Sequence, residues 1–338
     1  MAIKKHENEL QILIEKISHI VQSAKKNIVS NINEEMLTSY WEIGNLIHKK
    51  EKDDSNQTID VITELAQKLT IFLGKGFTRS SLTYMRQLYL KYPDGISASS
   101  YLSWSHYIEL LKIDDELERG FYENQTINDK WSVRELRRQR NSALFQRLAL
   151  SRDKEGILAL AREGQILRNE EDIKKDPLIL EFLNIPEKTR YSERELEARI
   201  IDNLQHFLLE LGKGFAFIAN QYRITLNNNH FYVDLVFYHR ILKCFVLIDL
   251  KIGEAKHQDV GQMNMYLNYF KKEENMTDDN PPIGIILAAA KDEIMIEYAT
   301  GGLSNKVFVS KYQTYLPDKA LLQERVQEIL DMEENEEK

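Results

Sequence analysis

The sequence is poor in cysteine and has no long apolar run. Its single cysteine, Cys244, excludes a disulfide within the chain, which is typical of proteins from a reducing compartment. No run approaches the roughly 20 apolar residues that a membrane-spanning helix needs. The N-terminal stretch MAIKKHENELQILIEKI is too polar for a signal peptide. We therefore expect a cytoplasmic protein that does not enter a membrane.

An excess of positive charge and the common metal and phosphate motifs are also absent. The chain has 45 Lys and Arg against 53 Asp and Glu, a net charge of −8. This total does not exclude a nucleic-acid partner, because phosphate binding depends on a local basic face. The 8 histidines show no HxH spacing and the chain has no CxxC, so no zinc site is predicted. The GxxxxGK[ST] spacing of a phosphate-binding loop is missing as well.

The length and the hydrophobic content favour two domains. The chain has 338 residues, 43% of them hydrophobic, which is enough to bury two ordinary cores. Residues 9–150 show helical periodicity and predict a mainly α-helical N-terminal domain. Residues 151–186 are more polar and are expected to form a linker with some helix in it, and residues 187–320 form the second domain. Residues 321–338 complete a helix and form an acidic tail.

The two domains differ in the elements that their patterns predict. After an amphipathic helix around residues 10–20, the N-terminal helices are expected at 36–47, 59–73, 80–92, 103–111 and 132–150. The second domain begins with a helix at 192–211, and further helical stretches are expected at 261–270 and 292–298. Its strands are expected at 215–220, 222–226, 231–238, 244–250, 283–288 and 306–309. This order predicts an α/β domain with a central mixed sheet flanked by helices.

Two apolar strands joined by a short polar turn carry the most informative acids. If Tyr238 pairs with Phe245, antiparallel pairing places Asp234 opposite Asp249, with Cβ atoms about 4.5–5.5 Å apart. Two carboxylates this close repel each other unless a cation lies between them, and Mg²⁺ prefers a few oxygen ligands plus waters. Lys251 lies on the same face as Asp249, because side chains alternate along a strand. The alternative is a pair of acids at exposed strand ends, with Lys251 as an ordinary salt-bridge partner.

The helices on either side of this hairpin add further polar candidates. Glu197 lies beside the apolar stripe of the preceding helix, where its carboxylate could contact a metal directly or through water. Glu193 and Glu195 are neighbours, and the alternative is that all three acids simply favour a helix N-terminus. Gln262 lies on the following helix. Its amide is either a ligand of a phosphate or of the attacking water, or an ordinary surface group.

The order helix Glu, strand Asp, strand (D/E)xK and helix Gln resembles the PD-(D/E)XK nuclease superfamily, and most closely its YhcG-like members. The segments LGKGFAFIANQYRI, FYVDLVFYHR, CFVLIDLKIGE and GQMNMYLNYF resemble that family's nuclease core. SYWEIGNLI, LSWSHYIELL and WSVRELRRQ resemble the helical domain that accompanies it. The resemblance implies a restriction-endonuclease-like core that hydrolyses phosphodiesters with Mg²⁺, or Mn²⁺ in its place. It assigns catalytic roles to Glu197, Asp234, Asp249 and Lys251, with Gln262 as an accessory residue.

The resemblance also implies a ligand set. The metal is expected to be held by the carboxylates of Asp234, Asp249 and Glu197 and by the backbone carbonyl of Leu250. Such a metal polarises the phosphate and lowers the pKa of a bound water. Lys251 is expected to orient that water or to stabilise the developing charge. The sequence departs from the family pattern twice. Valine replaces the usual proline before the first strand acid, and aspartate replaces the usual glutamate of ExK, which keeps the charge on a shorter side chain.

A basic helix in the N-terminal domain is a candidate for holding nucleic acid. Arg134, Arg137, Arg138 and Arg140 occur in the segment WSVRELRRQR, where the first three share one helical face. Such a stripe can follow a phosphate backbone and bind it in a salt-sensitive way with little base specificity. The alternative is a solvated helix face that pairs with acids from elsewhere in the chain.

Several other residues with useful chemistry are better explained as core. Trp104, His106 and Trp131 could stack on DNA, but aromatic side chains of helical domains more often pack inside. Cys244 lies in an apolar strand on the face opposite Asp249 and is expected to be buried.

These patterns together predict a metal-dependent endonuclease that acts on nucleic acid, with DNA as the expected substrate. Two alternatives remain open: a nucleic-acid-binding adaptor with a nuclease-like fold and no useful catalysis, and a protein-interaction scaffold. A homodimer is compatible with the prediction, because a double-strand break often takes two sites. Sequence specificity, the form of the substrate and the biological role are not predicted.

Overall fold

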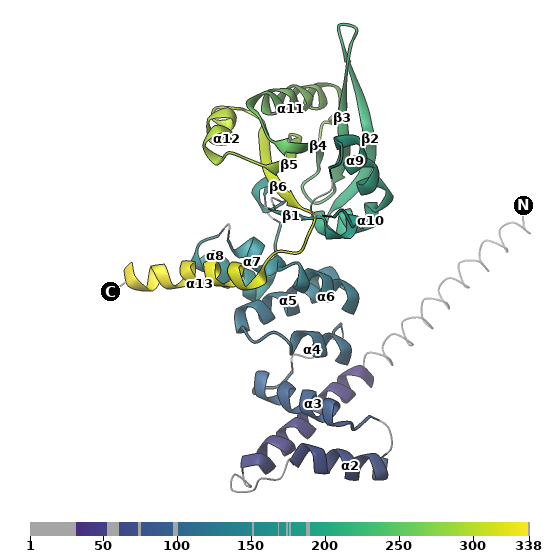
Figure 1. Cartoon of the computed structure of the whole chain (residues 1–338), viewed down its shortest axis with the longest axis vertical. Helices are drawn as coiled ribbons and strands as arrows, with labels where there is room; N and C mark the ends of the chain where they lie inside the picture. The colour runs from purple at the N-terminus through teal and green to yellow at the C-terminus, as the bar shows by residue number, and fades with distance from the viewer. Residues whose placement is uncertain are drawn as a thin grey trace, which may run out of the picture. The chain divides into compact units, whose positions relative to one another are not determined.

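The protein divides into two compact units, Met1–Arg137 and Arg138–Lys338. The computed structural model describes residues 32–52, 61–73, 76–96, 101–150, 152–167, 169–173, 175, 177–186 and 190–336 (Figure 1). The helix expected around residues 10–20 lies outside them. Within these ranges no helix is long and apolar enough to cross a membrane.

The first unit is helical, as its periodicity predicts. Residues 32–52 form a helix. The next elements are α2 (Val61–Leu73), α3 (Arg79–Lys91), α4 (Trp104–Leu110), α5 (Glu116–Asp129) and α6 (Val133–Asn141), which spans the division between the units. Helix α5 is missing from the expected elements, because its buried apolar residues, Phe121 and Tyr122, are adjacent in a polar segment and show no periodicity. Its N-terminus is capped by the side chain of Asp115, which accepts a hydrogen bond from the backbone N–H of Glu118.

The second unit is built on a six-stranded mixed sheet of order β1-β6-β5-β4-β3-β2. The strands are β1 (Leu178–Ile179), β2 (Phe215–Leu226), β3 (Asn229–His239), β4 (Cys244–Glu254), β5 (Ile283–Ala290) and β6 (Lys306–Gln313). The pairs β2–β3 and β3–β4 are antiparallel, whereas β4–β5, β5–β6 and β1–β6 are parallel. The predicted α/β architecture with a mixed sheet is therefore confirmed.

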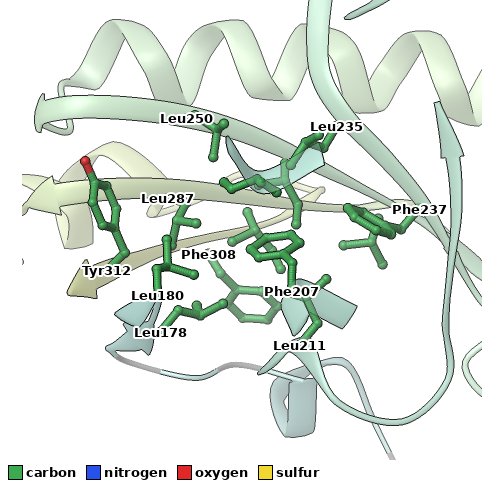
Figure 2. Packing of buried hydrophobic residues seen from close by; sticks show 14 of the residues in the cluster. Leu178, Leu180, Phe207, Leu211, Leu235, Phe237, Leu250, Leu287, Phe308 and Tyr312 are labelled. Atoms are coloured by element: carbon green, nitrogen blue, oxygen red, sulfur yellow. The ribbon is translucent and has the colours of Figure 1, made fainter. Parts of the chain in front are cut away.

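Four helices cover the two faces of this sheet: α9 (Glu193–Asp202) and α10 (Leu204–Leu211) pack on one core, and α11 (His257–Tyr269) and α12 (Glu293–Thr300) on a second. The unit also contains α7 (Leu144–Ala149), α8 (Lys154–Glu163) and α13 (Lys319–Glu336). Short 3₁₀ turns lie at Glu170–Ile173 and Glu181–Leu183, and one π-helical turn, Phe270–Glu274, extends α11. Figure 2 shows Phe207 and Leu211 of α10 packed with Leu235 and Phe237 of β3. Val260, Met263 and Leu267 of α11 belong to the second core.

Two helices that the periodicity predicts as continuous are each interrupted. The helix expected at 192–211 breaks at Asn203, whose side-chain amide donates to the backbone carbonyl of Arg199. Such a local bond competes with the helical ladder. The helix expected at 132–150 breaks at Ala143, which has a φ of 51°. Alanine is a strong helix former, so nothing in the local sequence indicates this turn.

The segment expected as a linker with some helix, residues 151–186, also contributes to the sheet. It contains α8 and the edge strand β1, in which Leu178 pairs with Tyr312 and Ile179 with Gln313 of β6. A two-residue strand is too short to show alternation, and its partner lies more than 130 residues further along the chain. The expected helix is therefore present as α8, whereas the edge strand β1 was not predicted.

A buried ion cluster lies around Glu210, at the end of α10. Its carboxylate is fully buried and accepts hydrogen bonds from Nη1 of Arg147 at 2.7 Å and from the backbone N–H of Ile179 at 3.0 Å. Nη2 of Arg138 lies 3.4 Å away, and Nζ of Lys175 donates to the backbone carbonyl of Glu210. Burial by itself raises the pKa of Glu210, but the three surrounding cations outweigh it and lower that pKa. The cluster joins α6, α7, α10 and β1.

Candidate active site

The β3–β4 hairpin brings the two predicted aspartates together at the end of its pairing. Tyr238 pairs with Phe245, which confirms the predicted register. The last regular pair is Leu235 with Ile248, so Asp234 and Asp249 are the next residues on the two strands. Beyond that point Oδ2 of Asp234 accepts a hydrogen bond from the backbone N–H of Leu250 at 2.7 Å. Beyond Asp234, towards its N-terminus, β3 pairs with β2 alone, so the two acids lie where the β2–β3 hairpin projects from the sheet (Figure 1).

Asp249 is a buried carboxylate that forms an ion pair with Lys251. The residue is 4% exposed, so it does not lie at an open strand end. Its Oδ2 is 2.6 Å from Nζ of Lys251. Burial raises the pKa of Asp249 to about 7, the charges of Asp234 and Asp259 add to the increase, and Lys251 opposes it. A buried acid with a strongly raised pKa beside a second acid is typical of a functional site.

Lys251 remains a cation at the centre of several acids. Its side chain is 19% exposed and lies 4.0 Å from Oδ1 of Asp259 as well as beside Asp249. Burial alone lowers the pKa of Lys251, but the carboxylates of Asp249, Glu193 and Asp259 outweigh it and raise that pKa. The predictions from sequence missed Asp259. Its other oxygen accepts from the backbone N–H of Lys256, so in sequence it resembles an ordinary first-turn acid of α11.

Glu197 reaches the aspartates through an amide rather than directly. The residue is buried on α9, and its two oxygens accept hydrogen bonds from Nε2 of Gln221 at 2.6 Å and from Nδ2 of Asn220 at 3.2 Å. The same Nε2 donates to Oδ1 of Asp234 at 3.0 Å. In the parts of the chain that the structure describes, no group of three or more His, Cys, Asp or Glu side chains converges as a metal site. The predicted set of three carboxylate ligands is therefore not gathered around one point.

Gln221 was not predicted as a site residue, although the sequence pattern is interrupted at its position. It lies in the middle of β2, where the alternation predicts two separate strands at 215–220 and 222–226. The strand is continuous, but Gln221 has a φ of 48°, a left-handed conformation that is uncommon for residues other than glycine. The break in the pattern was the only signal of its role.

Gln262 is linked to a second residue that the predictions missed. It is exposed on α11, and its Nε2 donates to the hydroxyl of Tyr266, which donates to the backbone carbonyl of Tyr232 at 3.0 Å. Burial raises the pKa of Tyr266, and the charges of Asp249 and Asp234 raise it further. The glutamine and the tyrosine lie four residues apart on one helix face, which is the spacing that could have indicated the pair.

The basic stripe predicted on α6 is not a single free face, and the assignment of Arg138 needs correction. Arg138 is enclosed by carboxylates: its Nε donates to Glu181 at 3.0 Å, its Nη2 approaches Glu210, and its side chain is 15% exposed. Nη2 of Arg137 donates to Glu109 at 2.7 Å. The alternative expectation, pairing with acids from elsewhere in the chain, therefore describes both residues. A phosphate would have to displace these carboxylates to bind Arg138.

The remaining residues of the helical unit are placed as follows. Arg134 is exposed and Arg140 is half-buried, so both stay candidates for contact with nucleic acid. Trp104 packs against a core formed by α3 and the helix at residues 32–52. His106 and Trp131 are buried, and Nε2 of His106 lies 3.1 Å from the backbone carbonyl of Trp131. The core interpretation of these aromatic residues fits the structure.

Two family models match the chain. The YhcG PDDEXK nuclease domain covers residues 171–327, and the DUF1016 N-terminal domain covers residues 16–147. The fold of the second unit is thus that of a PD-(D/E)XK nuclease domain. A curated relative from Escherichia coli (strain K12), named "Putative nuclease YhcG", is 36% identical over 341 residues and covers 90% of both chains. The chain therefore belongs to the YhcG nuclease family, as its motifs predict.

Solved structures show only distant likeness. The crystal structure of a repair endonuclease from Pyrococcus abyssi shares 20% identity over 39% of this chain and 50% of that chain, with a TM-score of 0.27. EndoMS in its apo form shares 17% identity over 39% of this chain and 49% of its own, with a TM-score of 0.26. The chain spans about half the length of these structures.

Proposed function

We propose that this nuclease-family protein hydrolyses DNA phosphodiesters with a divalent cation at the site formed by Asp234, Asp249 and Lys251. The observation that carries the proposal is the buried carboxylate of Asp249, which lies 2.6 Å from the ammonium of Lys251 and is close enough to Asp234 for that charge to raise its pKa. A buried acid whose pKa is raised by burial and by a second acid is typical of a functional site.

The donor set fits Mg²⁺ or Mn²⁺. Asp234 and Asp249, with the backbone carbonyl of Leu250, would hold the cation, and one or two carboxylates plus waters satisfy Mg²⁺ in many phosphate-handling sites. When bound, the cation polarises the scissile phosphate and lowers the pKa of a water. Glu197 is not gathered with the aspartates, so we do not include it among the direct ligands.

The protein's own groups supply the remaining chemistry. The ammonium of Lys251 lies beside Asp249 and stabilises negative charge that develops on the phosphate, because a fixed charge in a partly buried site is worth more than in water. The acids around Lys251 raise its pKa and so keep it charged. The exposed Gln262 on α11 would orient a phosphate or a water with its amide, and the buried hydroxyl of Tyr266 holds that amide in place.

Cleavage of supercoiled plasmid tests this proposal directly. We expect the purified protein to nick the plasmid with Mg²⁺ or Mn²⁺ and to lose this activity in EDTA. The variants Asp234→Ala and Lys251→Ala should cut at least about a hundredfold more slowly, because each removes a group that acts on the transition state. Asp278→Ala and Lys271→Ala, which change exposed residues of the same unit, serve as matched controls and should cut at the wild-type rate.

The other outcomes of that assay are equally informative. Wild-type rates for Asp234→Ala or Lys251→Ala would refute the assignment of the site. Salt-sensitive DNA binding without cleavage in any metal would favour the adaptor, and the same assay with branched DNA, single strands and RNA would then test for another substrate. Arg134 is the residue whose loss should weaken such binding without affecting the site.

Cation binding is expected to weaken as the pH falls below about 7. The pKa of Asp249 is about 7 in the metal-free protein, so at lower pH a proton must leave before the carboxylate can bind a cation. With one competing proton, the affinity falls about tenfold for each further pH unit. Calorimetric titration of Mn²⁺ at about pH 5.5, 6.5 and 8 measures the effect. An affinity that stays constant over this range would show that Asp249 does not bind the cation.

A further inference from the structure

Gln221 connects two carboxylates that come from different elements of the nuclease unit. Its Nε2 donates to Oε2 of Glu197 on α9 at 2.6 Å and to Oδ1 of Asp234 on β3 at 3.0 Å. The other oxygen of Glu197 accepts from Asn220, the preceding residue. A primary amide has two donor positions, and Gln221 uses both on acids. Hydrogen bonds to charged acceptors of this kind are stronger than neutral ones.

This link fixes the orientation of Asp234. Its Oδ1 is held by Gln221 and its Oδ2 by the backbone N–H of Leu250, so both oxygens of one carboxylate are anchored from two different strands. The plane of that carboxylate relative to Asp249 is then determined by Gln221. Glu197 in turn holds the amide of Gln221 in place.

The backbone of Gln221 supports a functional role. A φ of 48° in the middle of a long strand is unfavourable for a residue with a Cβ. Asn220 pairs with Leu235 and Tyr222 pairs with Val233, so ordinary pairing resumes on both sides of Gln221. The local distortion turns the amide toward the acids, and residues held in this way cluster at active sites.

We propose that Gln221 is a positioning residue of the cation site, and that Glu197 acts on this site through Gln221 rather than as a ligand. The inference rests on the proposed function and assigns roles to two of its residues. Residues that orient a metal ligand typically change metal affinity 10–100-fold when they are removed. If Glu197 acts through Gln221, then removing Glu197 should no longer change the metal affinity once the amide of Gln221 is gone.

Gln221→Gly is the variant that separates positioning from folding. Glycine adopts a positive φ without strain, so the backbone keeps its conformation and the fold keeps or gains stability, while the amide is lost. Asn227→Gly is the matched control, because Asn227 also has a φ of 48° and lies at the tip of the same hairpin, away from the acids. Thermal unfolding without metal should show no loss of stability in either variant.

The test measures Mn²⁺ affinity by calorimetry or electron paramagnetic resonance, in the absence of DNA. We expect Gln221→Gly to bind Mn²⁺ about 10–100-fold more weakly than the wild type, and Asn227→Gly to bind it equally well. Glu197→Ala should also weaken binding. The double variant should bind Mn²⁺ no more weakly than the single variant with the lower affinity, because the effects of two residues that act as one unit do not add.

Each contrary result has a distinct meaning. Wild-type affinity in Gln221→Gly would overturn the positioning role of Gln221. Losses that multiply in the double variant would show that Glu197 acts independently of Gln221. A wild-type protein that binds no divalent cation would overturn the proposed function itself, and this inference with it.

Discussion

Replacing Asp249 with asparagine is expected to abolish cleavage and, at the same time, to raise the stability of the metal-free protein above pH 7. Asparagine keeps the shape of the side chain and removes its charge. The loss of a cation ligand should slow cleavage at least about a thousandfold. The gain in stability follows from burial: the carboxylate is 4% exposed, and burial, aided by the charge of Asp234, raises its pKa to about 7 although Lys251 opposes the change.

The sign of the pH dependence follows from that increase. The unfolded chain has the ordinary pKa of 3.8, so between this value and about 7 the folded state binds more protons than the unfolded state. The stability that protonated Asp249 contributes is fully present below 3.8 and is lost as the pH rises through about 7. Asparagine cannot ionise and does not suffer this loss. The difference in melting temperature between Asp249→Asn and the wild type should therefore grow from low pH to about pH 8.

Thermal unfolding followed by circular dichroism in EDTA, at several pH values, measures this difference. We expect a gain on the order of 2 kcal/mol at about pH 8, which corresponds to several degrees in a domain of this size. Asp278→Asn is the control, because its carboxylate is exposed and its loss should change neither stability nor cleavage. A variant that is less stable than the wild type at both ends of the pH range would show that ionised Asp249 does not cost stability.

Removing Glu210 is expected to have the largest effect on stability. Glu210→Ala leaves the buried guanidinium of Arg147 and the N–H of Ile179 without their acceptor. Breaking a buried ion pair from one side typically costs about 3–5 kcal/mol, because the remaining charge stays buried without its counter-ion. For a domain of this size the melting temperature should fall by about 10 °C. Thermal unfolding near pH 7 measures the loss, and at that pH Glu210 is ionised because its pKa is lowered.

Two further variants separate the buried charge from general disruption. Glu181→Ala removes a partner of Arg138 that is more open to solvent, and should cost no more than about 1 kcal/mol. The double variant Arg147→Met with Glu210→Leu should cost less than the sum of its single changes, because it leaves no lone charge between the two positions. A Glu210→Ala protein within about 1 kcal/mol of the wild type would show that the cluster does not stabilise the nuclease unit.

The centre of the candidate site was predictable because its geometry is local. Asp234, Asp249 and Lys251 lie on two strands joined by a short turn, and the alternation of side chains with the pairing of Tyr238 and Phe245 sets their relation. Apolar runs bounded by polar turns located β3, β4 and the longer strands around them. For these elements, the interactions that decide the structure lie within about 20 residues, a span over which periodicity is informative.

Tertiary structure decided the partners of that centre. Gln221 meets Glu197 across 24 residues, and Arg138 meets Glu210 across 72, where no periodicity links the two positions. The basic stripe on α6 therefore suggested a free surface, although its most enclosed arginine belongs to a buried ion cluster. Asp259 likewise has the sequence context of an ordinary helix-cap acid.

The sequence by itself thus determined the class of fold, the family and the acids of the central hairpin, because hydrophobic periodicity and short-range pairing follow from neighbouring residues. Only the tertiary structure decided where two helices break, that β1 joins the sheet, and which charges neutralise one another. Those choices depend on burial and on contacts between distant segments, since a buried charge is stable only with the partners that the folded chain brings to it.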